Sequence, residues 1–380
     1  MQLSYKRVYL TAMGYELGPQ IVTSAELEAR LAPVYERLNL QPGQLEAWTG
    51  IVERRWWDDS ARLSAGATAA ARKALARAGL GPSDLGVVIY AGVCRENFEP
   101  ATACAVADNL GVHGSASVYD VSNACLGVLN GMLDIANRIE LGQIRAGLVV
   151  SCESAREINE IAIANLLGNE RDGAGKQPDM AAFAEALATF TGGSGAVAML
   201  LTDGSFAGEP GHRLCGAVSH IAPEHHRLCR WGIEAISSPG SSTSSSSNAS
   251  TSSVTGANQY AQQYAQYMVT DSVAVLKYGV QLGQQTWQSF MQAMAWTPAE
   301  VDRVVCHQVG SGHQDAILKS LQIPKEKDYT TYRFLGNMGT AALPVTAAIA
   351  DERGILKPGQ RAGFLGIGSG LTCLMMGFEW

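Results

Sequence analysis

The stretch DVSNACLGVLNGM, at residues 120–132, is the most informative part of the chain. It follows residues 116–119, which predict a short strand, and it opens a helical pattern that continues to about Ile139. This order places Cys125 at the N-terminus of a helix, where unpaired N–H groups and the helix dipole favour a thiolate. Taken alone, the stretch leaves a buried structural cysteine as the alternative.

Two polar residues in the second half of the chain stand at the same kind of junction. His307 directly follows the apolar strand pattern at residues 304–306 and precedes a helical pattern that starts at Ser311. Asn337 lies in the small-residue turn FLGNMGT, residues 334–340, before another helical run. Polar groups at strand-to-helix junctions are typical of active sites in α/β folds. A structural histidine and a turn-forming asparagine are the alternatives for each residue alone.

The chain also repeats one local plan. An Ala-rich helical pattern at residues 65–78 leads through a Pro-containing turn into the β-branched strand 87–90. A helix that ends near Met294 leads through a second such turn into the strand 304–306. This repetition predicts a duplicated α/β fold whose mostly buried sheets are covered by helices on both faces.

The composition narrows the classes of protein to consider. The 380 residues carry a net charge of −7, which argues against a nucleic-acid partner because no basic excess is present to neutralise phosphates. The eight cysteines form no CxxC pair, and the first ten residues contain no continuous apolar segment, so we expect a reduced, cytoplasmic protein. No run of about eighteen apolar residues occurs, so we expect no membrane span.

Four segments together resemble the condensing enzymes of the thiolase superfamily, specifically the ketoacyl-ACP synthase III branch. They are DVSNACLGVLNGM, VVCHQVGSGH (304–313), FLGNMGTAALP (334–344) and GIGSGLTC (366–373). The resemblance implies a five-layer αβαβα fold of two duplicated halves and a catalytic triad of Cys125, His307 and Asn337. Backbone N–H groups of Cys125 and near Gly370 are expected to form the oxyanion hole. We expect no metal and no cofactor.

Within that branch the chain resembles the OleA-type enzymes, which join two fatty acyl-CoA molecules head to head. The segments NACLGVLNG, FEPATA (98–103) and WTGIVERRWWD (48–58) carry this likeness. Joining two acyl thioesters without a malonyl group requires a base, and the resemblance assigns Glu99, reaching the site from the partner subunit of a homodimer. A solvated loop carboxylate is the alternative for Glu99. A decarboxylative 3-oxoacyl-ACP synthase III with a malonyl extender is the alternative function.

The expected substrates are acyl-CoA thioesters, with acyl carrier protein as an alternative second donor. The mouth of the site is predicted at residues where arginine can meet phosphates and an indole can stack on adenine. These residues are Arg54, Arg55, Trp56 and Trp57. A purely structural tryptophan pair is the alternative for the last two.

We divide the chain into an N-terminal half, residues 1–205, and a C-terminal half, residues 206–380. A helical insertion near 155–190 and a Ser-rich stretch near 237–257, interpreted as a mobile surface loop, interrupt this plan. Two copies of HRLC, at 212–215 and 226–229, fit no zinc module and lie in a segment that we interpret as irregular. The segment GGSGA (192–196) lacks the final glycine of a serine-hydrolase elbow.

Overall fold

The strands of the central sheet follow the order β12-β13-β14-β9-β2-β8-β7-β5-β6, and β1 also pairs with β9. The computed structural model describes residues 1–168, 179–209, 211–235 and 264–380. The ten strands of this sheet are β1 (Gln2–Ser4), β2 (Tyr9–Leu17), β5 (Val87–Ala91), β6 (Ser117–Val121), β7 (Ala146–Glu153), β8 (Gly195–Thr202), β9 (His212–Ile221), β12 (Arg303–Cys306), β13 (Arg361–Gly368) and β14 (Thr372–Glu379).

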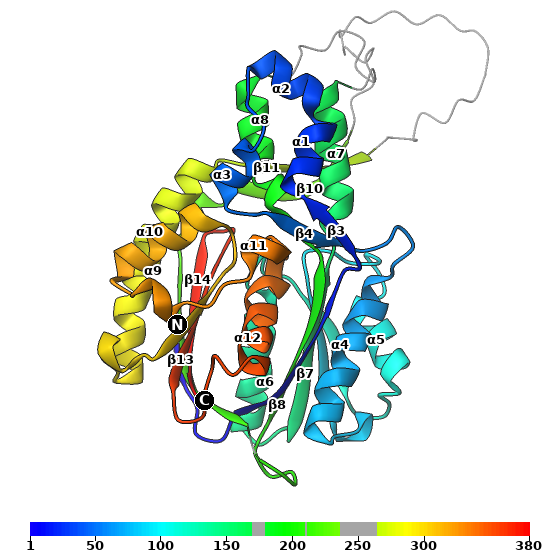
Figure 1. Ribbon diagram of the computed structural model, residues 1–380. Coiled ribbons are helices and arrows are strands. Elements are labelled where there is room, and N and C mark those ends of the chain that lie inside the picture. The colour runs from blue at the N-terminus through cyan, green and yellow to red at the C-terminus, as the bar shows by residue number, and fades with distance from the viewer. Residues whose placement is uncertain (169–178, 210, 236–263) are drawn as a thin grey trace, which may run out of the picture.

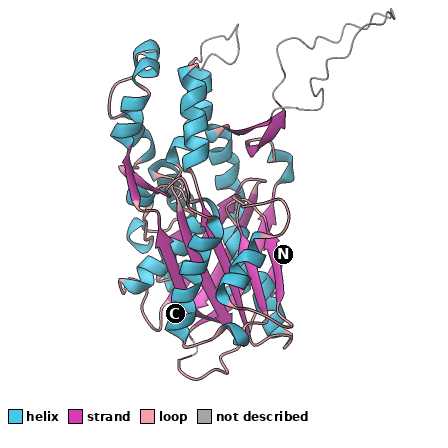
Figure 2. Cartoon of the chain, turned by 90° about the vertical axis from the view of Figure 1, so that its right-hand side faces the viewer, coloured by secondary structure: helices cyan, strands magenta, loops and turns pink. Residues whose placement is uncertain are grey.

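Helices cover the sheet in layers (Figures 1 and 2). The buried helices α6 (Gly127–Glu140) and α12 (Ala342–Glu352) lie between the two parts of the sheet. The helices α4 (Leu63–Ala78) and α5 (Thr102–Leu110) cover one outer face, and α9 (Ser272–Met294) and α10 (Ser311–Leu321) cover the other. The layers therefore alternate as αβαβα, which confirms the predicted fold.

Each interface between layers has its own apolar core. The central core joins α6 and α12 to both parts of the sheet, a second core lies under α4 and α5, and a third lies under α9 and α10. Strands β5, β7 and β8 are buried at every position because helices cover both of their faces. The second core contains many small side chains: Ala67, Ala70, Ala71 and Ala74 of α4 are fully buried.

The duplication is visible in the strand order. In the first half the strand order is β6-β5-β7-β8-β2. In the second half β12, β13, β14 and β9 take the positions of β5, β7, β8 and β2. Among its described residues, the second half has no full strand equivalent to β6. Where that strand would lie, a single parallel bridge joins Val304 to Asp328. The helices α6 and α12 are the equivalent central helices of the two halves, so the turns that precede them are equivalent as well.

A cap of shorter elements stands at one end of the layers (Figures 1 and 2). It contains α1 (Ser24–Arg30), α2 (Ala32–Leu38), α3 (Gln44–Thr49), α7 (Arg156–Leu167), α8 (Met180–Ala186), the β3 (Gln20–Thr23)–β4 (Glu53–Trp56) pair and the β10 (Cys229–Ala235)–β11 (Tyr264–Thr270) pair. The short helix α11 (Tyr332–Leu335) lies against β4. A separate core that includes Leu27, Phe183 and Phe190 holds the cap together.

The predicted helical insertion near 155–190 contains α7 and α8, and its residues 169–178 lie outside the described residues. The Ser-rich stretch near 237–257 lies wholly outside them. The division of the chain between residues 205 and 206 stays a prediction. Among the described residues, no helix has the length and apolar character needed to cross a membrane.

Candidate active site

Cys125 lies in the turn between β6 and α6. The turn requires a left-handed backbone at Ala124, whose φ is +45°, and α6 begins at Gly127. The hydroxyl of Thr340 accepts a hydrogen bond from the N–H of Val128 at 2.8 Å. Because Thr340 belongs to the turn that precedes α12, this bond holds the starts of the two central helices together. It brings the segment of Cys125 next to the segment that carries Asn337.

His307 is the first residue after β12, and its N–H donates to the carbonyl of Leu365 at 3.0 Å. The next residue, Gln308, is buried and accepts hydrogen bonds from the N–H groups of Thr331 (2.8 Å) and Tyr332 (3.2 Å) through Oε1. The Nδ1 atom of His307 is enclosed and has no hydrogen-bond partner within the described part of the chain. The other ring nitrogen, Nε2, is therefore the one that opens into the pocket.

Asn337 is held by its own backbone. Its N–H donates to the carbonyl of Thr191 at 2.8 Å, and its carbonyl accepts from Gly193 at 2.9 Å. The preceding residue, Gly336, has a φ of +65°, and an added Cβ would meet the Thr191 carbonyl at 2.6 Å, so this tight approach requires glycine. The side-chain Oδ1 of Asn337 accepts from the N–H of Gly339 at 3.1 Å. This bond leaves the amide Nδ2 to donate into the pocket.

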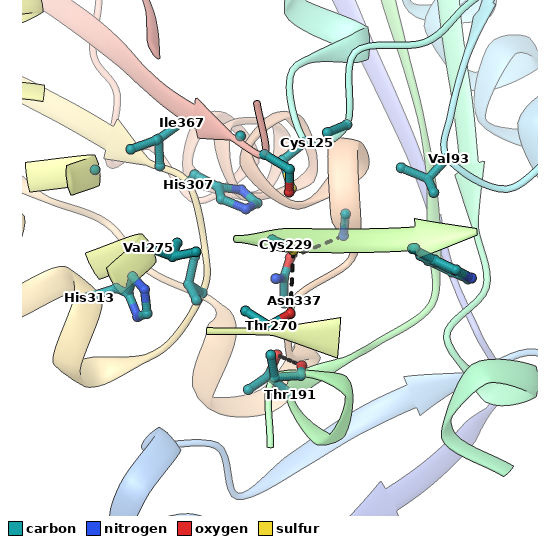
Figure 3. Close-up of a pocket in the computed structure, with 18 of the residues that line it drawn as sticks. Val93, Cys125, Thr191, Cys229, Thr270, Val275, His307, His313, Asn337 and Ile367 are labelled. Atoms are coloured by element: carbon teal, nitrogen blue, oxygen red, sulfur yellow. Dashed lines mark hydrogen bonds between the residues drawn. The ribbon is translucent and has the colours of Figure 1, made fainter. Parts of the chain in front are cut away.

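One cavity of about 560 Å³ contains all three side chains. Figure 3 shows Cys125, His307 and Asn337 pointing into it from three separate segments. Aliphatic residues form much of the wall, among them Val93, Ile158, Val275, Val280, Ile317, Leu365, Ile367, Leu371 and Met375. The β10–β11 pair contributes Cys229, Arg230, Trp231, Tyr267, Met268 and Thr270. The pocket therefore combines a few polar groups at one point with a long apolar wall.

Burial controls the charge states of Cys125 and His307. The pKa of Cys125 is raised to about 12, mainly by burial and to a smaller extent by the neighbouring Cys229 and Glu153. Burial also lowers the pKa of His307 to about 4, with a smaller contribution from His313. The prediction that the helix terminus favours a thiolate at Cys125 is therefore wrong. Because α6 begins only at Gly127, desolvation outweighs the helix terminus.

Glu153, Cys229 and His313 also line the pocket, and sequence reasoning missed all three. Glu153 is buried, and its two carboxylate oxygens accept from the N–H groups of Val93 (3.0 Å) and Cys94 (3.0 Å). Burial raises the pKa of Glu153, and these backbone donors oppose the increase. A charged residue at the end of the apolar run 146–152 is the signal that could have identified it.

Glu99 and Gly370 do not line this pocket. Glu99 is exposed on the loop between β5 and α5, beside Phe98, which is 92% exposed. At the C-terminal turn, Gly368 rather than Gly370 approaches the nucleophile: a Cβ added to Gly368 would lie 3.3 Å from the backbone nitrogen of Cys125. The roles of Glu99 and Gly370 stay predictions.

The structure gives two of the four residues predicted at the CoA mouth a different position. Arg54 is fully buried and donates to Ser24 Oγ (3.0 Å) and to the carbonyl of Phe190 (3.0 Å), and Trp56 is buried in the core of the cap. Neither side chain can meet a ligand in this arrangement, so their placement at the mouth is corrected. Trp57 donates Nε1 to the carbonyl of Glu153 at 3.0 Å, behind the pocket wall. Arg55 is half-buried on β4.

The first HRLC copy begins strand β9, so the prediction of irregular structure is wrong there. In the second copy residues 226–228 form a turn and only Cys229 belongs to a strand, β10, so that copy is largely irregular, as predicted. The described residues contain no group of three or more His, Cys, Asp or Glu side chains suited to a metal ion. Ser194, in the GGSGA segment, is fully buried and its hydroxyl accepts from the N–H of Ala155 at 3.1 Å.

Known proteins resemble this chain over its whole length. The family described as 3-Oxoacyl-[acyl-carrier-protein (ACP)] synthase III C terminal matches residues 291–380. An acyl-CoA:acyl-CoA alkyltransferase of Shewanella oneidensis is 49% identical over 380 residues, 100% of both chains, and one of Xanthomonas campestris pv. campestris is 33% identical over 378 residues, 99% of both.

The solved structures agree with these relatives. A Cys-to-Ser variant of Xanthomonas campestris OleA with bound lauric acid and lauroyl-CoA has a TM-score of 0.84 and 33% identity, covering 99% of this chain and 100% of that one. The layered fold and the full-length identities define an enzyme of the thiolase superfamily. Within it, the chain belongs to the family of OleA-type acyl-CoA:acyl-CoA alkyltransferases.

Proposed function

We propose that this protein joins two fatty acyl-CoA molecules in a Claisen condensation that proceeds through an acyl group carried on Cys125. The observation that carries the proposal is the common pocket, where Cys125, His307 and Asn337 meet a long aliphatic wall. The names of its relatives, acyl-CoA:acyl-CoA alkyltransferases, support the same reaction.

The first step is thioester exchange. The Sγ atom of Cys125 attacks the carbonyl carbon of the first acyl-CoA, the bond from that carbon to the CoA sulfur breaks, and CoA leaves as the thiol. Because the pKa of the Cys125 thiol is about 12, the proton must leave Sγ as the attack proceeds. His307 has a pKa of about 4 and is neutral at pH 7, so in the tautomer with its proton on Nδ1 its Nε2 is able to accept this proton and pass it to the CoA sulfur. In the second step the ring acts in the other tautomer, with its proton on Nε2.

The second step forms the carbon–carbon bond. A second acyl-CoA loses an α-proton, and the resulting enolate oxygen receives hydrogen bonds from His307 Nε2 and Asn337 Nδ2. The α-carbon then attacks the carbonyl of the Cys125 thioester, and the backbone N–H of Cys125 stabilises the tetrahedral oxyanion. Expulsion of the Cys125 thiolate, which takes up the proton removed from the α-carbon, gives a β-keto thioester. Its hydrolysis gives a 2-alkyl-3-oxo acid.

The α-proton acceptor in this proposal is Glu99 of a second subunit. Glu99 is exposed and outside its own pocket, and the adjacent Phe98 presents a nearly uncovered ring. An apolar side chain beside the base would be covered in a two-fold dimer, in which each loop serves the other subunit. Light scattering at assay concentration tests this directly, and an active monomer would contradict it.

At the mouth of the pocket, Arg230 is the exposed arginine on the described wall, and we propose that it meets the phosphates of CoA. Arg55 and Trp57 remain predictions. The protein is further proposed to act in the cytoplasm without a metal or resident cofactor. Acyl carrier protein remains an alternative second donor.

The deciding experiment compares products. Wild-type enzyme is incubated with myristoyl-CoA alone and with myristoyl-CoA plus malonyl-CoA or malonyl-ACP, and products are identified by mass spectrometry. Condensation of myristoyl-CoA alone is the expected result. Glu99→Gln should still form the acyl-enzyme but should stop before condensation, because an amide cannot accept the α-proton. Glu36→Gln, at an exposed site on α2, is the matched control.

The second candidate function is a decarboxylative synthase III, which the match of residues 291–380 to that family favours. In that reaction, loss of CO₂ supplies the carbanion and no base is needed. Turnover that requires a malonyl thioester and is indifferent to Glu99→Gln would establish it and would overturn the non-decarboxylative proposal.

A further inference from the structure

The helix α9 has an unusual composition on the face that meets the cavity. Its residues that line the cavity lie three or four positions apart or adjacent, along one stripe: Ser272, Val275, Leu276, Gly279, Val280 and Gly283. Two of these six are glycines in the interior of a helix. Glycine destabilises a helix interior relative to alanine, so local helix stability does not explain them.

Both glycines leave space that a side chain would take. A Cβ added to Gly279 would lie 2.9 Å from Ile367 Cδ1, and one added to Gly283 would lie 2.7 Å from Ile317 Cδ1. Among the described residues, and apart from the backbone of α9 and the chain neighbours, these added atoms meet no other group within 4 Å. Both contacts are the ends of flexible side chains that themselves line the cavity, so the fold could accommodate larger residues only at the expense of the cavity.

The stripe also marks where the cavity ends. From Val275 to Gly283 it extends for about 12 Å at the helical rise of 1.5 Å per residue. One turn further, Thr286 and Trp287 are buried and absent from the wall, and the Trp287 ring packs with Phe290. The opposite wall comes from β13, β14 and α10, and it is aliphatic at Ile317, Leu365, Ile367 and Met375.

This side of the cavity starts beside the nucleophile. Ile367 precedes Gly368, and a Cβ on Gly368 would lie 3.6 Å from the Cβ of Cys125. Figure 3 shows Ile367 and Val275 on the same side of the pocket, with His307 between Ile367 and Cys125. A straight chain attached to Cys125 can therefore pass Ile367 and continue along α9.

We propose that Gly279 and Gly283 determine the length of the acyl chain bound to Cys125, by keeping open a channel along α9 that ends at Trp287. The ligand class is an unbranched, long alkyl chain, because the wall is aliphatic and because Gly279 and Gly283 carry no side chain that would fill the channel. This inference rests on the proposed acylation of Cys125 but not on the condensation that follows.

The test measures acylation in competition. Wild type, Gly283→Ala and Gly283→Val are mixed with equal amounts of octanoyl-CoA and palmitoyl-CoA, and the ratio of the two acyl-enzymes is read by intact-mass analysis during the first turnover. One methylene group too many in an apolar pocket changes selectivity by roughly tenfold or more, so Gly283→Val should lower the palmitoyl share by at least about tenfold. Gly283→Ala should lower it less.

Controls separate this effect from folding and from the main proposal. Gly312→Ala, in α10, adds a Cβ that meets no described atom outside its own helix within 4 Å and should leave the ratio unchanged. Gly283→Ala should melt no lower than wild type, because alanine favours the helix. An unchanged ratio in Gly283→Val, or an equal loss for both acyl-CoAs, would overturn the inference. A wild type that is acylated but does not condense would overturn the proposed condensation and leave this ratio valid.

Discussion

The loop that follows β12 in the second half and the equivalent loop that follows β5 in the first half take different paths relative to the active site. After β12, residues 307–310 form a short connection that begins with His307 and turns directly into α10. After β5, residues 92–101 form a longer connection that touches the pocket at Val93 and then leaves it. The tip of the long loop carries Phe98 and Glu99 on the surface.

This difference shows how a duplicated fold produces an asymmetric site. The equivalent central helices each present one polar residue before their first turn, Cys125 before α6 and Asn337 before α12. The equivalent loops diverge, since one closes the site of its own chain and the other extends outward. We interpret the short loop as the internal half of the catalytic machinery and the long loop as the part offered to a second subunit.

Removing the nucleophile should have the largest effect. Cys125→Ala cannot form the thioester intermediate, so condensation should fall by at least on the order of 10⁴-fold, and no acyl group should be added to the protein. The measurement is intact mass after mixing with myristoyl-CoA, with product analysis beside it. Cys104→Ala, which removes an exposed free thiol, is the matched control. Substantial condensation by Cys125→Ala would exclude covalent catalysis.

The residues of the second half should separate the two steps. Asn337→Ala removes one donor to the enolate and should reduce condensation on the order of 10²-fold while Cys125 still becomes acylated. His307→Ala should slow both steps, because His307 is also proposed to carry the thiol proton. Rapid-quench mass spectrometry follows acylation and product together, with His113→Ala at an exposed site as the control. Equal behaviour of the two variants would contradict the separate roles.

The position of these three residues could be predicted because strand ends are visible in sequence. The apolar run at 304–306 ends directly before His307, the strand pattern at 116–119 ends shortly before Cys125, and the small-residue turn at 334–340 isolates Asn337. Chain order in an α/β fold places such ends at one edge of the sheet. The helix at 65–78 and the strands at 87–90 and 304–306 follow from the same kind of pattern, and the structure has them within a few residues.

The rest could not be predicted because it depends on what covers each surface. Residues of β4 alternate, so Arg54 and Trp56 point to one face and Arg55 to the other. The sequence alone does not show that the cap covers the face of β4 that carries Arg54. Sequence reasoning therefore assigns this buried side chain to a ligand. Likewise, the depth of Cys125 raises its pKa against the helix dipole, and depth is a tertiary property.

The charge state of the nucleophile can be measured through its reactivity. With a pKa of about 12, alkylation of Cys125 by iodoacetamide should accelerate about tenfold per pH unit over roughly pH 7 to 10, without a plateau, because only the thiolate reacts. Peptide mapping by mass spectrometry gives the rate at Cys125 alone. A plateau below about pH 8 would show that the helix terminus outweighs burial after all.

The smallest effects concern the anchors at the roots of the two loops. Glu153 accepts from Val93 and Cys94 with separate oxygens, whereas Gln308 accepts from Thr331 and Tyr332 with one oxygen and donates Nε2 to the carbonyl of Cys306 at 2.7 Å. The near-isosteric exchanges Glu153→Gln and Gln308→Glu each place one wrong atom against the backbone. The two anchors should nevertheless respond unequally.

Glu153→Gln loses one hydrogen bond but also removes a charge that burial disfavours, so it should lower the free energy of unfolding by only about 1 kcal/mol. Gln308→Glu puts a carboxylate oxygen against the Cys306 carbonyl and buries a new charge without a counter-ion, which should cost on the order of 3 kcal/mol. Urea unfolding at pH 7 and one protein concentration, followed by tryptophan fluorescence, compares them. If Glu153→Gln is the more damaging exchange, the carboxylate charge itself is required at the root of the long loop, and the two anchors are not equivalent structural devices.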